Sequence, residues 1–275
     1  MEKKQDRIYL TCCKNNNMKR YLLMAMFFPF LPIYTNLENP TVNIQKNTMV
    51  ENEGTHPAHI KDIELPAGFS RVKADKNSFA EWLGSLKLKE NKTVYLYNGQ
   101  PKRNQTAQFA VIDISVGNKD LQQCADAVMR MRAEYLYAQK RFDEIVFWDN
   151  NKTAYRLSAN QDRKHFDAYL ENVFYRCGTA SLEKQLKIVQ DLKSVKPGDV
   201  LIKGGFPGHA MMVMDMAKNN KGKIIYLLAQ SYMPAQDIHI VVNPFGQKGN
   251  PWYELNEGVV VTPEWVFPER HFRAW

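Results

Sequence analysis

The 275-residue chain contains no Cys-x-x-Cys pair, no His-Glu-x-x-His segment and no glycine-rich phosphate-binding loop. These absences argue against a zinc site and against the common nucleotide-binding motifs. The chain also lacks internal repeats, low-complexity tracts and an apolar run long enough to cross a membrane as a helix. With 44% hydrophobic and 24% charged residues, its composition is that of a globular protein. We therefore expect a folded chain that uses neither a metal nor a cofactor.

Positive charge is not concentrated on the folded part of the chain. The formal net charge is +8, but residues 1–34 alone hold six Lys/Arg against two acids. The remainder carries 31 basic and 27 acidic residues, which is an ordinary solvated surface. Without a dense basic stripe or a nucleic-acid-binding motif, we expect no nucleic-acid partner.

A short basic stretch followed by a brief apolar run predicts a secretory signal peptide at residues 18–35. Lys19 and Arg20 precede the run, which is about 14 residues long. Pro29 and Pro32 interrupt it and count against the alternative, a helix in a protein core. We therefore expect an exported protein, periplasmic or secreted, that meets the membrane only through this leader.

The order of elements after the leader predicts the fold class. Residues 1–17 are then an N-terminal extension, residues 36–59 are polar and predicted to be a linker, and residues 60–275 are predicted to form a single domain. The clearest helical stripe runs over 119–140. Strands are expected at 200–202, 209–216, 224–230, 237–242 and 258–262. Helices followed by a meander of strands predict an α+β domain with N-terminal helices and a C-terminal antiparallel sheet.

Three residues have the chemistry of a cysteine hydrolase. Attack on an acyl carbon needs a thiol, an imidazole within reach and a third group that orients the imidazole. Gly178 is expected to break the helical run after Cys177, which would place that thiol near the start of a new helix, where a thiol pKa falls. His209 opens a predicted strand, and Gln230 lies near the end of the next one. We expect Cys177 as nucleophile, His209 as general base and Gln230 as the orienting residue.

Structural roles for the same residues remain open. A single helix over 165–190 would make Cys177 an inert core thiol, and an oxidising compartment would allow it to form a disulfide with Cys124. Cys124 itself lies on the apolar stripe of the helix expected at 119–140, so core packing is its default role. His209 alone would then cap a strand.

The segment from Val195 to Ser231 resembles the histidine-bearing half of the NlpC/P60 and CHAP cysteine hydrolases. The residues that carry the resemblance are Pro197-Gly198-Asp199, Gly208-His209 and Gln230. The resemblance implies a papain-like (NlpC/P60-like) fold and the same three roles for Cys177, His209 and Gln230. It also implies action on amide bonds of peptidoglycan stems, so peptidoglycan or another envelope peptide or glycan is the expected partner.

Over residues 60–275 the chain resembles the family known as domain of unknown function 4846, found mostly in Bacteroides and its relatives. The motifs that carry this resemblance are Asp120–Arg130, Gly178–Leu182, Pro207–Ala210, Ala229–Gln236 and Thr262–Trp265. It implies an exported bacterial protein and no particular activity. Three functions therefore stay open. The first is a cysteine amidase or peptidase of envelope peptides, and the second is a non-catalytic envelope protein on the same fold that binds a peptide, glycan or protein partner. The third is a cofactor-free binding module centred on the Gln230-Ser231-Tyr232 loop.

Overall fold

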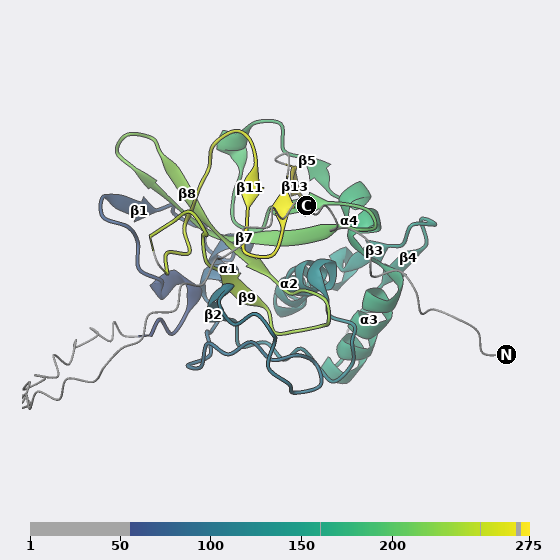
Figure 1. Ribbon diagram of the computed structural model, residues 1–275. Coiled ribbons are helices and arrows are strands. Elements are labelled where there is room, and N and C mark those ends of the chain that lie inside the picture. Colours follow the sequence, from purple (N-terminus) through teal and green to yellow (C-terminus); the bar gives the residue numbers. More distant parts are fainter. Residues whose placement is uncertain (1–55, 160, 248, 268–270) are drawn as a thin grey trace, which may run out of the picture. The chain divides into compact units, whose positions relative to one another are not determined.

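A nine-stranded antiparallel sheet dominates the structure, which is a computed structural model (Figure 1). The structure describes residues 56–159, 161–247, 249–267 and 271–275. The strands of this sheet are β1 (Phe69–Arg71), β2 (Gln108–Val111), β5 (Lys187–Ile188), β6 (Val200–Lys203), β7 (His209–Asn219), β8 (Ile224–Gln230), β9 (His239–Val241), β10 (Tyr253–Glu254) and β13 (Phe272–Ala274). Seven of them follow the order β2-β9-β8-β7-β6-β13-β5, while β1 pairs with β7 and β10 pairs with β8.

Four helices and two small hairpins surround this sheet. The helices are α1 (Phe79–Gly84), α2 (Cys124–Ala138), α3 (Arg163–Arg176) and α4 (Thr179–Gln185). The hairpins are β3 (Val146–Trp148) with β4 (Ala154–Arg156), and β11 (Val260–Val261) with β12 (Val266–Phe267). Helix α2 packs against β7 and β8, and Figure 1 shows α3 and α4 grouped beside it.

Both faces of the central strand β7 are buried, which explains its nearly continuous apolar sequence. Ala210 and Met212 point into the core cluster that contains α2. Met211 and Val213, the alternate residues, point into a second cluster that contains side chains of the β11–β12 hairpin. The pairing of β7 with β8 shifts register between Val213 and Asp215, so the alternation changes beyond that point.

Helix α2 begins at Cys124 because its first turn is capped there. The backbone N–H of Gln123 donates to the Asp126 carboxylate at 2.9 Å, which satisfies a group at the helix start. The buried stripe of α2, which includes Val128, Met131 and Leu136, then holds the helix on the sheet. The thiol of Cys124 therefore lies in the first turn of the longest helix described.

The helical run near Cys177 is interrupted, as the sequence indicated. Helix α3 ends at Arg176, Cys177 is extended, and α4 starts at Thr179. The backbone N–H of Gly178 donates to the Ser181 hydroxyl at 3.1 Å, so the second helix has its own start. A single helix over 165–190 is therefore not formed.

The predicted α+β, papain-like fold with N-terminal helices is wrong. The structure is mostly an antiparallel sheet with few helices, and no papain-like fold is shown. Within the described residues before α2, the only α-helix is the six-residue α1. Strands β1 and β2 come from that same part of the chain, yet they pair with β7 and β9 of the C-terminal half. They have only three and four residues, too few for a clear alternating pattern.

The predicted extension, signal peptide and most of the linker lie outside the described residues. The described residues belong to one compact unit, Asn52–Trp275. In that part of the chain, no helix combines the length and the apolar character that a membrane crossing requires.

Candidate functional site

His209 is the first residue of β7 and lies in a closed, largely aromatic environment. His209 is only 1% exposed. The imidazole centroid lies 5.0 Å from that of Tyr232, 5.2 Å from Trp265 and 5.9 Å from Phe267. Its Nε2 hydrogen-bonds Gln230 Oε1 at 2.8 Å. The structure thus places these two predicted site residues in direct contact.

The amide of Gln230 has one orientation that satisfies its neighbours. Its Nε2 donates to Glu264 Oε2 at 2.8 Å and lies 3.3 Å from His239 Nε2. His239 Nδ1 lies 2.9 Å from the Asp237 carbonyl, which can only accept, so Nδ1 holds the proton and Nε2 is an acceptor. Both contacts require the NH₂ group of Gln230 on that side. Its Oε1 must therefore face His209, so His209 carries its proton on Nε2 and its lone pair on Nδ1.

A buried ion pair between Lys102 and Glu264 contacts the side-chain amide of Gln230 through Glu264. Lys102 Nζ donates to Glu264 Oε2 at 2.6 Å, and the two side chains are 6% and 13% exposed. Asn104 Nδ2 donates to the other carboxylate oxygen at 3.3 Å. Burial lowers the pKa of Lys102, and the bond to Glu264 acts in the opposite direction. Neither Lys102 nor Glu264 was identified from the sequence.

Cys124 lies at the same end of β7 as His209. The backbone N–H groups of Ala210, the residue after His209, and of Ala125 and Cys124 itself lower the pKa of its thiol. Electrostatic interaction also links Cys124 to Tyr232, whose ring contacts that of His209. The cysteine remains partly exposed. Cys124 therefore lies where α2 packs against β7, the strand that His209 begins.

Burial keeps both groups neutral at neutral pH. Burial, followed by the charge of Asp126, raises the pKa of the Cys124 thiol to about 11, although the surrounding N–H groups lower it. Burial also lowers the pKa of His209 to about 4, against a smaller opposite effect of the bond to Gln230. A neutral imidazole with a free Nδ1 lone pair can act as a general base for an adjacent thiol.

The hydroxyl of Ser231 joins the segment before α2 to the end of β8. Ser231 is completely buried, and its Oγ lies 2.9 Å from the Gln122 carbonyl and 2.8 Å from the Gln236 carbonyl. Gln122 precedes Cys124 by two residues, and Ser231 directly follows Gln230. This hydroxyl therefore fixes the cysteine-bearing helix relative to the strand that carries the amide.

Cys177 has different surroundings. It follows the last residue of α3 and packs partly buried against the main core cluster. Burial raises the pKa of its thiol to about 12, with further contributions from Asp126 and Asp149. In the described residues, no recorded interaction joins His209 to the thiol of Cys177 or to that of Cys124. Cys124 and Cys177 are both free thiols, so the disulfide considered from the sequence is not present.

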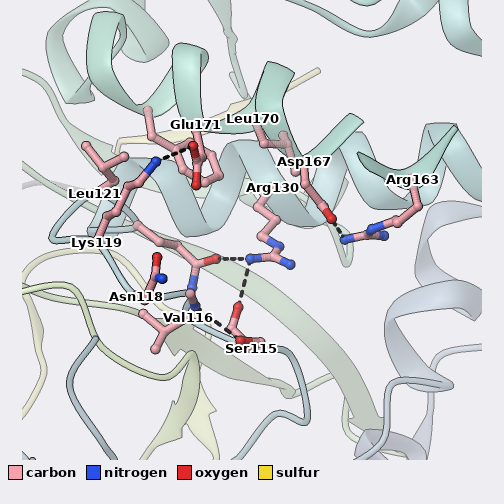
Figure 2. A pocket seen from close by; sticks show the side chains of 13 residues that line it. Ser115, Val116, Asn118, Lys119, Leu121, Arg130, Arg163, Asp167, Leu170 and Glu171 are labelled. Carbon is pink, nitrogen blue, oxygen red and sulfur yellow. Dashed lines mark hydrogen bonds and ion pairs between the residues drawn. The ribbon is translucent and has the colours of Figure 1, made fainter. Parts of the chain in front are cut away.

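Two hollows of about 330 Å³ each lie on either side of the loop 115–117. One is lined by Leu121 and Gln122, which lead into α2, and by polar residues of α2 and α3 (Figure 2). In it, Arg130 Nη1 donates to the Gln122 side chain at 2.7 Å and to the Ser115 carbonyl at 2.8 Å. The lining of neither hollow includes Cys124 or His209, but this one reaches the segment just before the thiol.

Within the described ranges, no cluster of His, Cys, Asp and Glu has an arrangement suited to a metal ion. The interacting groups found here are instead a thiol, an imidazole, an amide and a carboxylate.

Comparison with known families matches residues 60–157 and 146–274 to the model described as domain of unknown function (4846). The search of curated proteins and the search of solved structures returned no match.

Proposed function

The chain belongs to the family of domain of unknown function 4846, and on that premise we propose that it is a cysteine hydrolase. Cys124 is the nucleophile, His209 the general base and Gln230 the orienting residue. The substrate is an amide bond in a peptide of the bacterial cell envelope, and the protein is exported.

One arrangement of groups carries this proposal. His209 is held through Nε2 by Gln230 Oε1 at 2.8 Å, so its Nδ1 is left to accept a proton. Cys124 is the first residue of α2, which packs against β7, and the backbone N–H of Ala210, the residue after His209, lowers the pKa of its thiol. A nucleophile, a base and a group that orients the base are the three parts that covalent acyl transfer requires.

The reaction proceeds from the neutral thiol and imidazole. His209 Nδ1 accepts the thiol proton as the Cys124 sulfur attacks the amide carbon. The N–H groups at the start of α2 lie beside the sulfur and stabilise the oxyanion that develops. Collapse of the intermediate breaks the C–N bond, and His209 returns the proton to the leaving amine. Water, activated by His209, then hydrolyses the thioester to a carboxylic acid and regenerates the thiol.

The hollow shown in Figure 2 is the proposed binding site for part of the substrate. It opens beside Leu121 and Gln122, and its rim carries the ion pairs Lys119–Glu171 and Arg163–Asp167. Such a rim offers both donors and acceptors to a peptide with charged groups. The expected leader supports a substrate in the envelope.

Burial of the histidine favours a second candidate, a non-catalytic envelope protein that binds a peptide, glycan or protein partner. His209 is only 1% exposed beneath Tyr232, Trp265 and Phe267. In this alternative, the imidazole is a structural group in the core.

Incubation with soluble peptidoglycan fragments separates the two functions. The full chain and its His209→Ala variant are mixed with fragments that carry stem peptides, and mass spectrometry follows the release of new amines and acids. Hydrolysis by the unaltered protein and its loss in the variant support the proposal. Binding without hydrolysis by both proteins supports the second candidate and contradicts the first.

A further inference from the structure

The polar groups behind His209 form a chain that ends in a buried charge. Glu264 Oε2 accepts from Gln230 Nε2 at 2.8 Å and from Lys102 Nζ at 2.6 Å. The chain spans 162 residues of sequence between Lys102 and Glu264. It contributes no group that touches a reacting atom, so its role must be exerted through Gln230.

We propose that Glu264 is a positioning residue that sets the tautomer of His209. By accepting from the NH₂ group of Gln230, it keeps the amide oxygen facing His209, which holds the imidazole proton on Nε2 and the lone pair on Nδ1. The catalytic consequence of this tautomer rests on the proposed function, whereas the tautomer itself does not.

The ion pair makes Glu264 an obligatory acceptor. A protonated carboxyl group could donate to an amide oxygen and so allow Gln230 to turn around, but an ionised carboxylate can only accept. Lys102 Nζ donates to the same oxygen at 2.6 Å, so this oxygen accepts from both Lys102 and Gln230. His239 Nε2 also accepts from Gln230, but at the longer distance of 3.3 Å. Glu264 is therefore the stronger determinant of the orientation of the amide.

Reversal of the amide would remove the base. With the NH₂ group of Gln230 facing His209, Nε2 of the imidazole would have to accept, and the proton would move to Nδ1. Nδ1, the nitrogen that acts as the base in the proposed function, would then be a donor with no lone pair. In serine hydrolases, a wrong histidine tautomer costs about 10⁴-fold in rate.

Two double variants without the ion pair separate the role of Glu264 as a hydrogen-bond acceptor from the effect of its charge. Lys102→Met/Glu264→Gln and Lys102→Met/Glu264→Leu both lack the ion pair, but only the first keeps an oxygen that can accept from Gln230. Nitrogen-15 NMR of histidine-labelled protein reports the tautomer of His209, assigned by the loss of its signals in His209→Gln. We expect the Nε2–H tautomer in the unaltered protein and in the Gln variant, and a clear population of Nδ1–H in the Leu variant. Hydrolysis by the Leu variant should be at least about tenfold slower than by the Gln variant, with KM little affected.

The NMR measurement tests the role of Glu264 and the hydrolysis assay tests the proposed function, so either claim can be contradicted without the other. The Nε2–H tautomer in all three proteins, or Nδ1–H in the unaltered protein, overturns the role of Glu264 whatever the activity. The expected tautomers without any hydrolysis leave the positioning role intact and contradict the proposed function. If the Leu double variant does not fold, Glu264→Gln and Glu264→Met with Lys102 retained repeat the same comparison.

Discussion

The two cysteines of the described part differ in their place relative to the helices: Cys124 is the first residue of α2, and Cys177 is an extended residue between α3 and α4. The backbone N–H groups of Cys124, Ala125 and Ala210 lower the pKa of the Cys124 thiol. Cys177 follows the end of α3, and the influences on its thiol that are resolved all raise its pKa, burial first and then Asp126 and Asp149. Both cysteines are partly buried, and neither forms a disulfide. Burial therefore does not distinguish them, whereas the direction of the nearby backbone groups does.

The difference shows what a thiol needs before it can act on a substrate. Of the two cysteines, only Cys124 has backbone N–H groups that lower the pKa of its thiol, and its helix packs against the strand that His209 begins. The predictions that follow test this contrast between Cys124 and Cys177, beginning with the largest effect.

Replacement of the two cysteines separates them most strongly. Cys124→Ser should lower the rate of amide hydrolysis by about 10³-fold or more, because the nucleophile is lost. Cys177→Ser, the matched control, should stay within about threefold of the unaltered protein. Rates measured on the same peptidoglycan fragments check this. Equal losses in both variants would end the assignment of Cys124.

The histidine beside Cys124 makes stability depend on pH. Its pKa is about 4 in the folded protein against 6.5 as the ordinary value, so the unfolded chain binds the proton first as the pH falls. Stability is therefore lost between about pH 6.5 and pH 4, on the order of 3 kcal/mol from this group. His209→Gln, which keeps a donor for Gln230, should lack this loss. Urea unfolding at several pH values measures the difference, and the two curves should run parallel above pH 7. Parallel curves down to pH 4 would contradict the pKa assignment.

Gly208 precedes His209 and Gly178 follows Cys177. Replacement of each by alanine should change the unfolding free energy by different amounts. A Cβ on Gly208, next to His209, would lie 2.4 Å from the Thr179 hydroxyl and 2.6 Å from the Gly205 carbonyl. Gly208→Ala should therefore cost about 1–3 kcal/mol of unfolding free energy. A Cβ on Gly178, next to Cys177, would meet nothing within 4 Å, so Gly178→Ala should change stability by less than about 0.5 kcal/mol. Urea denaturation of both variants tests the contrast, and a larger cost at Gly178 would refute it.

The smallest effect concerns the packing role of Cys177. Cys177→Ala removes a sulfur atom from the edge of the main core and should cost about 1 kcal/mol. Thermal unfolding checks this, with Tyr175→Ala as a control because that side chain is 71% exposed. An unchanged melting temperature for Cys177→Ala would show that the sulfur contributes nothing to the core.

The sequence was informative where patterns are local. Gly178 indicated the helix break, and the apolar alternation placed His209 and Gln230 on neighbouring strands, where their side chains meet. The papain-like fold was wrong because β1 and β2 are very short and pair with distant strands. Pairing between distant segments leaves little trace in the periodicity of a strand of three or four residues.

Cys124 was assigned to the core because its position on the apolar stripe of α2 is that of a packing residue. The helix was expected to begin at residue 119 and begins at Cys124, and this difference of five residues moves the cysteine from the interior of the helix to its first turn. The acid at position 126 is the signal that could have fixed the start, since it caps the N–H of Gln123. Lys102 carried no local signal, and Glu264 lay in the motif Thr262–Trp265 without a role, because the two side chains pair across 162 residues of sequence.

Ser231 has a consequence for anyone who would give this scaffold a new reaction. The buried hydroxyl of Ser231, the residue after Gln230, hydrogen-bonds the carbonyl of Gln122 in the segment before α2. Redesign can vary the exposed Met233 and the rim of the hollow freely, because neither sets the spacing of the helix and the strand. Position 231 should be left unaltered in any such library. A change there would remove the hydrogen bond that joins the segment before α2 to the end of β8.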